Sequence, residues 1–159
     1  MPLPDPAGPA KPRPKPAIGW REWIGLPDLG VAWVKAKVDT GARSSSLHAF
    51  DIDIAETAGL VRFVVHPMQD DDVTTVPCTA ELLELREVRS SNGDAEVRPV
   101  IRTTALIAAT PYEIELTLTR RDEMGFRMLL GRSAMRGRFV VDVARSFLSG
   151  GDRLGPSQR

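Results

Sequence analysis

The chain has 159 residues with 42% hydrophobic content, and its 21 basic residues (Lys and Arg) equal its 21 acidic ones (Asp and Glu). This length suffices for one domain with a core of its own, and the balanced charge argues against a general affinity for nucleic acid or acidic membrane. A single cysteine excludes an internal disulfide, no apolar run reaches the length of a membrane span, and the N-terminus lacks the apolar core of a secretory signal, so we expect a cytoplasmic protein without membrane association.

Both ends of the chain have the composition of tails. Residues 1–17 hold seven of the thirteen prolines, which favours extended conformations over a packed core. Residues 150–159 are rich in Gly and polar residues, as at a frayed end. We therefore expect a disordered tail over 1–17, one folded domain over 18–149 and a flexible tail over 150–159.

An apolar strand is predicted just before an Asp-Thr-Gly sequence. Residues 32–38 alternate in character with the period of two of a half-buried strand, and Asp39, Thr40 and Gly41 follow where the strand ends. Peptide hydrolysis by two carboxylates needs one to accept a proton from water and one to donate a proton to the scissile amide. Because Asp-Thr-Gly occurs once, the pattern predicts that two chains build one site. The alternative is an ordinary surface turn, in which these residue types are common.

Strand patterns continue through the rest of the domain. Residues 50–54 and 113–119 alternate between apolar and polar side chains, and a short helix is predicted near Ser133. Further strand-like runs, punctuated by Gly, Pro, Asn and Asp, lie at 61–66, 73–78, 81–89, 97–108, 127–131 and 138–143. We predict an all-β fold: a small closed barrel of antiparallel strands with one short helix near the C-terminus.

A β-hairpin is predicted around an Asn-Gly pair. Ser91, Asn92, Gly93 and Asp94 separate two strand-like arms, and Asn-Gly tolerates the positive φ angles of a tight hairpin turn. The tip should span residues 90–94.

A second motif, at residues 128–132, changes the meaning of the first. Met128 and the apolar residues after it end in Gly131 and Arg132. Two motifs in this order resemble the retropepsin-like aspartic proteases, in which a catalytic Asp-Thr/Ser-Gly-Ala loop is backed by a later strand of two hydrophobic residues and Gly, then by Arg and a short helix.

A more specific resemblance covers residues 18 to 150. The stretches 38–46, 61–67, 90–93, 100–104, 114–119 and 128–132 are similar to a bacterial family often labelled ATP-dependent zinc proteases. Members are regarded as retropepsin-like, and some are encoded beside RimK-type ligases that add glutamate residues to a ribosomal protein.

The resemblance implies a retropepsin-like acid-protease barrel that works as a homodimer. Asp39 of each chain would form the catalytic dyad, and Thr40 and Gly41 would brace the two loops. The predicted hairpin would be a flap that closes over a peptide or protein substrate; an ordinary solvent-exposed hairpin is the alternative. The remaining implied residues are Leu129, Leu130, Gly131 and Arg132 for support of the catalytic loop, and Ala42, Arg43, Ser91, Asn92 and Gly93 for substrate binding.

Arg43 departs from the pattern of many retroviral relatives, which carry an Asp four residues after the catalytic Asp. Arg132 must then find another partner: Asp51, Asp142 or a main-chain carbonyl. We hypothesise that Arg43 faces the cleft and binds a substrate carboxylate, since a guanidinium offers bidentate hydrogen bonds. That role would suit a glutamate-extended ribosomal protein tail; a solvated or structurally paired Arg43 is the alternative.

The zinc and ATP of the family label find no motif in the sequence. There is no HExxH, and no Gly-rich loop ends in Lys-Ser or Lys-Thr. A mixed site of His48, His66 and Cys78, assembled by folding, is the alternative to our expectation of no metal and no cofactor. The predicted function is an aspartic endopeptidase, and the alternative function is a non-catalytic barrel that binds a peptide or associates with the ribosome.

Overall fold

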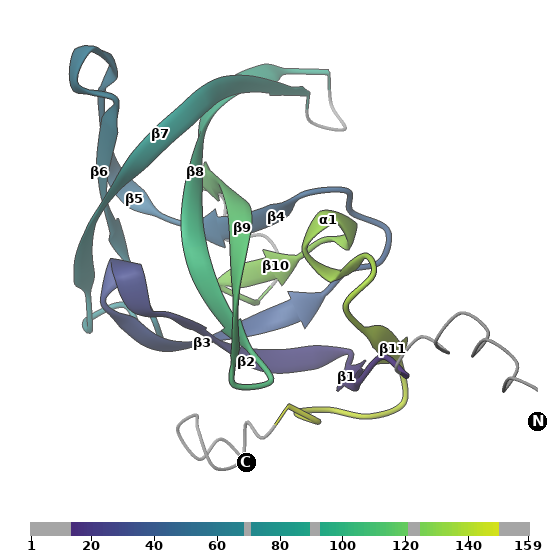
Figure 1. Cartoon of the computed structure of the whole chain (residues 1–159). Helices are drawn as coiled ribbons and strands as arrows, with labels where there is room; N and C mark the ends of the chain where they lie inside the picture. Colours follow the sequence, from purple (N-terminus) through teal and green to yellow (C-terminus); the bar gives the residue numbers. More distant parts are fainter. Residues whose placement is uncertain (1–13, 69–70, 90–92, 121–124, 150–159) are drawn as a thin grey trace, which may run out of the picture.

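The structure is a computed structural model that describes residues 14–68, 71–89, 93–120 and 125–149 (Figure 1). Most of the two predicted tails, residues 1–13 and 150–159, lies outside the described residues. The short helix α1 spans Arg132–Met135, and single 3-10 turns, η1 and η2, span Pro27–Leu29 and Glu56–Ala58. The strands are β1 (Ala17–Gly19), β2 (Arg21–Leu26), β3 (Val31–Val38), β4 (Ser45–His48), β5 (Phe50–Ala55), β6 (Leu60–Val65), β7 (Val76–Arg89), β8 (Ala95–Ile107), β9 (Thr110–Thr119), β10 (Met128–Leu130) and β11 (Val140–Asp142).

Six strands close into a barrel. The main sheet has the order β2-β3-β10-β4-β9-β8-β7-β6-β5, and Gly25 of β2 also pairs with Leu106 of β8. This extra pairing joins β2, β3, β10, β4, β9 and β8 into a ring, while β7, β6 and β5 extend the sheet beyond it. The predicted all-β closed barrel with one short C-terminal helix is therefore confirmed.

Two details of the predicted barrel are wrong. The strands are not all antiparallel, because β3 pairs with β10 and β4 pairs with β9 in parallel. The runs at 73–78 and 81–89 do not form two strands: residues 76–89 form the single strand β7, with an irregular register between Leu82 and Glu84. A bulge of this kind bends a strand without ending it. The alternation of side chains is therefore interrupted within β7, although the strand itself continues.

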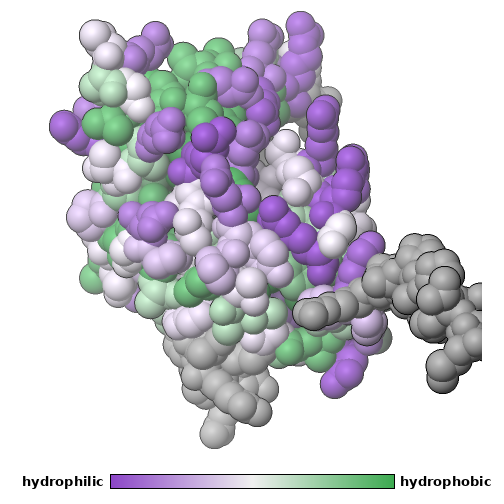
Figure 2. All heavy atoms as spheres, in the orientation of Figure 1, coloured by the Kyte–Doolittle hydropathy of each residue, from purple (hydrophilic) through white to green (hydrophobic). Residues whose placement is uncertain are grey.

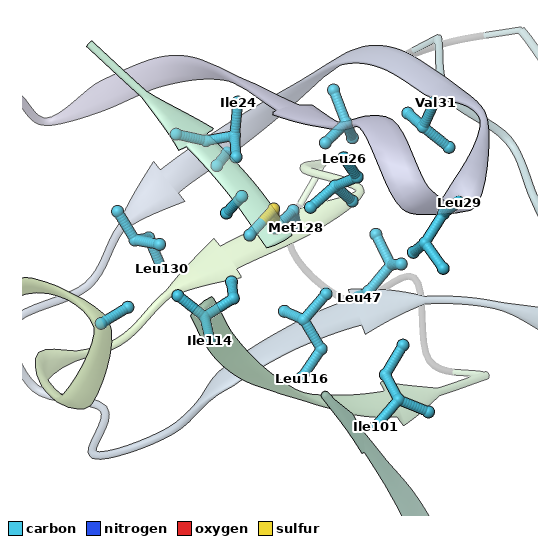
Figure 3. Close-up of a cluster of buried hydrophobic side chains, with 14 of the residues drawn as sticks. Ile24, Leu26, Leu29, Val31, Leu47, Ile101, Ile114, Leu116, Met128 and Leu130 are labelled. Atoms are coloured by element: carbon cyan, nitrogen blue, oxygen red, sulfur yellow. The ribbon is translucent and has the colours of Figure 1, made fainter. Parts of the chain in front are cut away.

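The core fills the barrel with the apolar faces of these strands (Figure 3). Ile24, Leu47, Leu116 and Leu130 are fully buried, and Met128 is 1% exposed. On β9 the inward residues alternate with the exposed Glu113 and Glu115, as predicted, but Thr117 and Thr119, predicted to lie on the same polar face, are buried at 6% and 7% exposure. Burying a side chain of this size contributes about 1.5–3 kcal/mol, so the barrel interior is the main source of stability.

The long hairpin of β7 and β8 projects beyond the barrel. β6 pairs with β7 only as far as Glu81, and β9 pairs with β8 only from Val100 onward, whereas β7 and β8 pair with each other as far as Arg89 and Ala95. In Figure 1 this projecting part arches over the end of the barrel that carries β4 and α1. The arms of the predicted hairpin are confirmed, and residues 90–92 of its tip lie outside the described residues.

A two-stranded sheet joins the two ends of the described chain. β1 pairs in parallel with β11, from Ala17 with Val140 to Gly19 with Asp142. The helix in the described residues, α1, has four residues, and none that the structure describes is long and apolar enough to cross a membrane.

Candidate active site

The loop of residues 39–44 connects β3 to β4 and carries the Asp-Thr-Gly sequence. The strand before it is held in the core by Val34, Ala36 and Val38. The N–H of Asp39 donates to the carbonyl oxygen of Leu130 at 2.9 Å, which extends the parallel pairing of β3 and β10 by one residue. Asp39 is thus fixed to the barrel through its backbone, while its side chain is only partly buried.

A tight turn orients the Asp39 carboxylate. The N–H of Gly41 donates to Oδ1 of Asp39 at 2.9 Å, and the N–H of Ala42 donates to the Asp39 carbonyl oxygen at 3.3 Å. Thr40 and Gly41 are exposed at the end of this turn. The loop therefore presents one carboxylate at the surface of the barrel, in a conformation set by main-chain hydrogen bonds.

The second motif lies directly behind this loop. The N–H of Arg132 donates to the carbonyl oxygen of Ala42 at 2.8 Å, and the N–H of Ser133 donates to that of Arg43 at 3.0 Å. The Arg132 guanidinium donates from Nη1 to the carbonyl oxygens of Thr40, at 3.1 Å, and Gly41, at 3.0 Å. Of the three partners considered for Arg132, the structure selects main-chain carbonyls.

Gly131 allows the two motifs to approach each other. Its N–H donates to Oγ of the fully buried Ser45 at 3.0 Å. A Cβ atom on Gly131 would lie 2.4 Å from the Ser44 carbonyl oxygen, which is closer than the 3.0 Å that Cβ atoms keep from other heavy atoms. Leu129 and Leu130, which precede Gly131, are 8% and 0% exposed and anchor this contact in the barrel. Nothing in the local sequence marks Ser45 as the partner of Gly131.

A polar pocket of about 370 Å³ lies beside the loop, lined by Arg43, Ser44, Arg86, Glu115 and Ser133. Arg43 is exposed and lines this pocket, and its role in binding a substrate carboxylate stays a prediction. Arg86 was missed by sequence reasoning, because its strand looked like an ordinary solvent-facing arm. The only available signal was its position on the predicted flap.

Two of the residues predicted to bind substrate, Ser91 and Asn92, lie outside the described residues. Gly93 is exposed at the start of the second arm and has φ +88°, a value that favours glycine. On the other side of the loop, Thr40 borders a second pocket of about 260 Å³, together with Arg132, Met135, Arg136, Phe139 and Val141.

His48, His66 and Cys78 do not assemble a metal site. The rings of His48 and His66 stack with centroids 6.2 Å apart, but Sγ of Cys78 donates to the carbonyl oxygen of Leu29 at 3.3 Å. Within the part of the chain that the structure describes, no group of three or more His, Cys, Asp or Glu residues is arranged to hold a metal ion.

Comparison with known proteins identifies the family. The model of the RimB-like family, described as "Retropepsin-like aspartic endopeptidase RimB", matches residues 17–151. The chain belongs to the RimB-like family. The barrel, the Asp-Thr-Gly turn and the second motif behind it are thus the features of a RimB-like, retropepsin-like domain.

Curated relatives of this RimB-like chain carry a different name. It is 44% identical over 135 residues to a probable alpha-L-glutamate ligase of Shewanella pealeana, a match that covers 84% of the chain and 30% of the ligase. A probable alpha-L-glutamate ligase of Parasynechococcus marenigrum is 47% identical over 127 residues, which cover 79% of the chain and 27% of that protein. The chain therefore spans less than a third of the length of these relatives.

A solved structure shares the fold. A protein of unknown function from Legionella pneumophila superposes on the RimB-like chain with a TM-score of 0.69 at 28% sequence identity. The similarity covers 84% of this chain and 98% of the Legionella protein.

Proposed function

We propose that this RimB-like chain is an aspartic endopeptidase whose dyad consists of Asp39 from each of two chains. The observation that carries the proposal is the geometry of Asp39: a half-buried carboxylate at the end of β3, oriented by the Gly41 N–H and tied to the second motif through the carbonyl of Leu130. The family description supports the same chemistry.

The reaction needs two carboxylates in different protonation states. Two adjacent carboxyl groups share one proton, since like charges in close contact push their titrations apart. The ionised Asp39 takes a proton from water while the water oxygen attacks the scissile carbonyl carbon. The protonated Asp39 of the second chain donates its proton to the amide nitrogen, which leaves as an amine when the C–N bond breaks.

A homodimer follows from the content of the loop. Residues 39–44 contain a single carboxylate, so one chain supplies half of the dyad. Thr40 and Gly41 are exposed and small, which lets the loops of two chains approach across a two-fold axis. Arg132, bonded to the carbonyls of both residues, holds the loop in shape for this contact.

The proposed substrate is a glutamate-rich or glutamate-extended protein tail, such as that of a ribosomal protein. Arg43 lines a polar pocket next to the loop and offers a guanidinium to a substrate carboxylate. The ligase name of the curated relatives supports this substrate class, because the chain matches about 30% of those longer proteins and leaves most of their length for a ligase activity. A segment that removes glutamates would then reside in the same polypeptide as one that adds them.

The same ligase name favours one alternative function. A barrel that forms less than a third of a glutamate ligase can serve as a binding module, holding a peptide tail without cleaving it. In this case Asp39 would contribute only a turn, and the hairpin and pocket would contact the bound peptide.

Cleavage of a mixed peptide library, followed by mass spectrometry, separates the two functions. The library includes glutamate-extended peptides, and wild type is compared with Asp39→Asn, each with and without a metal chelator. We expect cleavage that needs Asp39 and ignores the chelator. Cleavage that persists in Asp39→Asn, or that the chelator abolishes, would refute the aspartic dyad, and binding without cleavage would favour the binding module. Light scattering at micromolar concentration tests the dimer, since a strict monomer cannot assemble the dyad.

A further inference from the structure

The polar pocket beside the catalytic loop is built from two sides. Arg43 and Ser44 come from the loop and Ser133 from α1, whereas Arg86 comes from β7, on the projecting hairpin. Nη1 of Arg86 lies 3.4 Å from Oγ of Ser44, a contact between the hairpin and the loop. Figure 2 shows strongly hydrophilic side chains toward the right-hand end of the hairpin and over the neighbouring end of the barrel, beside a hydrophobic patch at the top of the molecule.

Register places Arg86 on the inner face of the hairpin. Arg86 is directly opposite Arg98, and residues opposite each other in an antiparallel pair share a face. Arg86, Arg98 and the next pair on the same face, Val88 and Glu96, are half-buried. The pair between them, Glu87 and Val97, lies on the other face and is exposed. The contact of Arg86 Nη1 with Oγ of Ser44 shows that the Arg86 side chain turns toward the loop of residues 39–44.

Arg86 contacts two carboxylates, one closely and one at a longer distance. Its Nε donates to Oε1 of Glu84 at 2.8 Å, and Nη2 also contacts this carboxylate. The other acid, Glu115, is farther away, with Oε2 at 3.8 Å from Nη2 of Arg86. With Glu84 counted beside the five lining residues, the two positive charges of Arg43 and Arg86 face the two negative charges of Glu84 and Glu115, so a substrate carboxylate has to displace one of these acids. Glu115 is the acid that is easier to displace, because its contact with Arg86 is the longer one.

We propose that Arg86 determines specificity by binding a substrate carboxylate together with Arg43, and that this carboxylate takes the place of Glu115. The inference rests on the proposed function and deepens it. A guanidinium binds a carboxylate through two parallel hydrogen bonds, and the hydroxyls of Ser44 and Ser133 add further donors. A carboxylate held by both arginines bridges the hairpin and the catalytic loop, so an acidic side chain draws the hairpin over the substrate beside Asp39.

The test compares peptides that differ only by Glu or Gln at one position. The readout is the ratio of kcat/KM for the Glu peptide to kcat/KM for the Gln peptide, in wild type, Arg86→Met and Arg86→Lys. We expect the ratio to fall at least about fivefold in Arg86→Met, a size that allows for the partial exposure of Arg86, and to recover in part in Arg86→Lys, which keeps the charge but not the bidentate geometry. An unchanged ratio in Arg86→Met overturns the inference.

Two further variants separate recognition from stability. Arg102→Met is the matched control, because Arg102 forms a comparable exposed ion pair with Glu113 at 2.8 Å and does not line the pocket. It should leave the Glu to Gln ratio unchanged. Glu115→Gln removes the competing carboxylate and should raise the ratio, whereas a merely structural role for the Arg86 contacts would not favour the Glu peptide. A ratio that falls in Glu115→Gln also counts against the inference.

Peptide binding to a variant that cannot cleave tests the carboxylate site independently of the proposed protease activity. Fluorescence anisotropy measures the dissociation constants of labelled Glu and Gln peptides for Asp39→Asn, with and without Arg86→Met. If no peptide is cleaved by wild type, the protease proposal fails, yet tighter binding of the Glu peptide that depends on Arg86 still supports the carboxylate site. Equal binding of both peptides overturns the site, even if Asp39-dependent cleavage is found.

Discussion

Gly131→Ala tests whether the close approach of the two motifs builds the site. Gly131 has φ −92°, an angle that alanine adopts without strain, so any cost of the substitution is steric. Its Cβ would lie 2.4 Å from the Ser44 carbonyl oxygen and 2.5 Å from the Ser44 carbonyl carbon. Side-chain Cβ atoms do not come closer than 3.0 Å to such atoms, so the backbones must separate by at least 0.6 Å.

The magnitude follows from what this separation disturbs. Overpacking a tightly packed site costs about 1–3 kcal/mol. The hydrogen bond from the Gly131 N–H to the buried Ser45 hydroxyl weakens as well, and a buried polar group that loses its partner costs about 1–3 kcal/mol. We expect Gly131→Ala to lower the free energy of unfolding by about 3 kcal/mol and the Tm by about 6–12 °C for a chain of this size.

The assay is chemical and thermal denaturation, with peptide cleavage measured under conditions where the variant is folded. Cleavage should fall by about tenfold or more, since a misplacement of about 1 Å in a catalytic group costs roughly two orders of magnitude. Gly137→Ala is the control: Gly137 has φ +77° and open space around it, so alanine there costs about 1 kcal/mol of backbone strain and no packing. A Gly131→Ala protein within about 0.5 kcal/mol of wild type would refute the steric reasoning.

Two other predictions concern buried groups away from the loop. The Glu22 carboxylate is fully buried and accepts hydrogen bonds from the N–H groups of Gly19, Leu148 and Ser149. Glu22→Gln places an amide donor against these donors, so it should lower the free energy of unfolding by about 2–3 kcal/mol and speed hydrogen exchange at residues 145–149. Unchanged exchange at these residues would contradict this role. Burial raises the pKa of the Cys78 thiol from 9.0 to about 11; because the folded pKa is the higher one, the resulting stabilisation is present below pH 9 and is lost as the pH rises through 11. The native protein should therefore resist a thiol reagent at pH 8 and react once denatured, and rapid labelling of the native state would show that Cys78 is accessible.

Much of the local structure was predictable from residue patterns. The alternation before Asp39 predicted a strand that ends at the Asp-Thr-Gly turn, and Gly131-Arg132 predicted a strand end followed by a short helix; both are present. The two motifs were also expected to meet, on the basis of family resemblance. The strand before Asp39 and the turn after it depend on side-chain periodicity and turn chemistry within a few residues, which the backbone geometry of strands and turns dictates directly.

Other features depended on contacts between distant segments. The parallel pairings of β3 with β10 and of β4 with β9 join residues about 90 and 70 positions apart (from Val38 to Leu130 and from Ser45 to Leu116), and no local pattern specifies them. Arg86 enters the pocket of Arg43 only because the bent strand β7 carries it over the loop. The sequence by itself determined where strands run and where a carboxylate follows one; the tertiary structure decided which partners surround that carboxylate. The physical reason is that a strand's period is a property of its own backbone, whereas register and closure depend on the packing of the whole barrel.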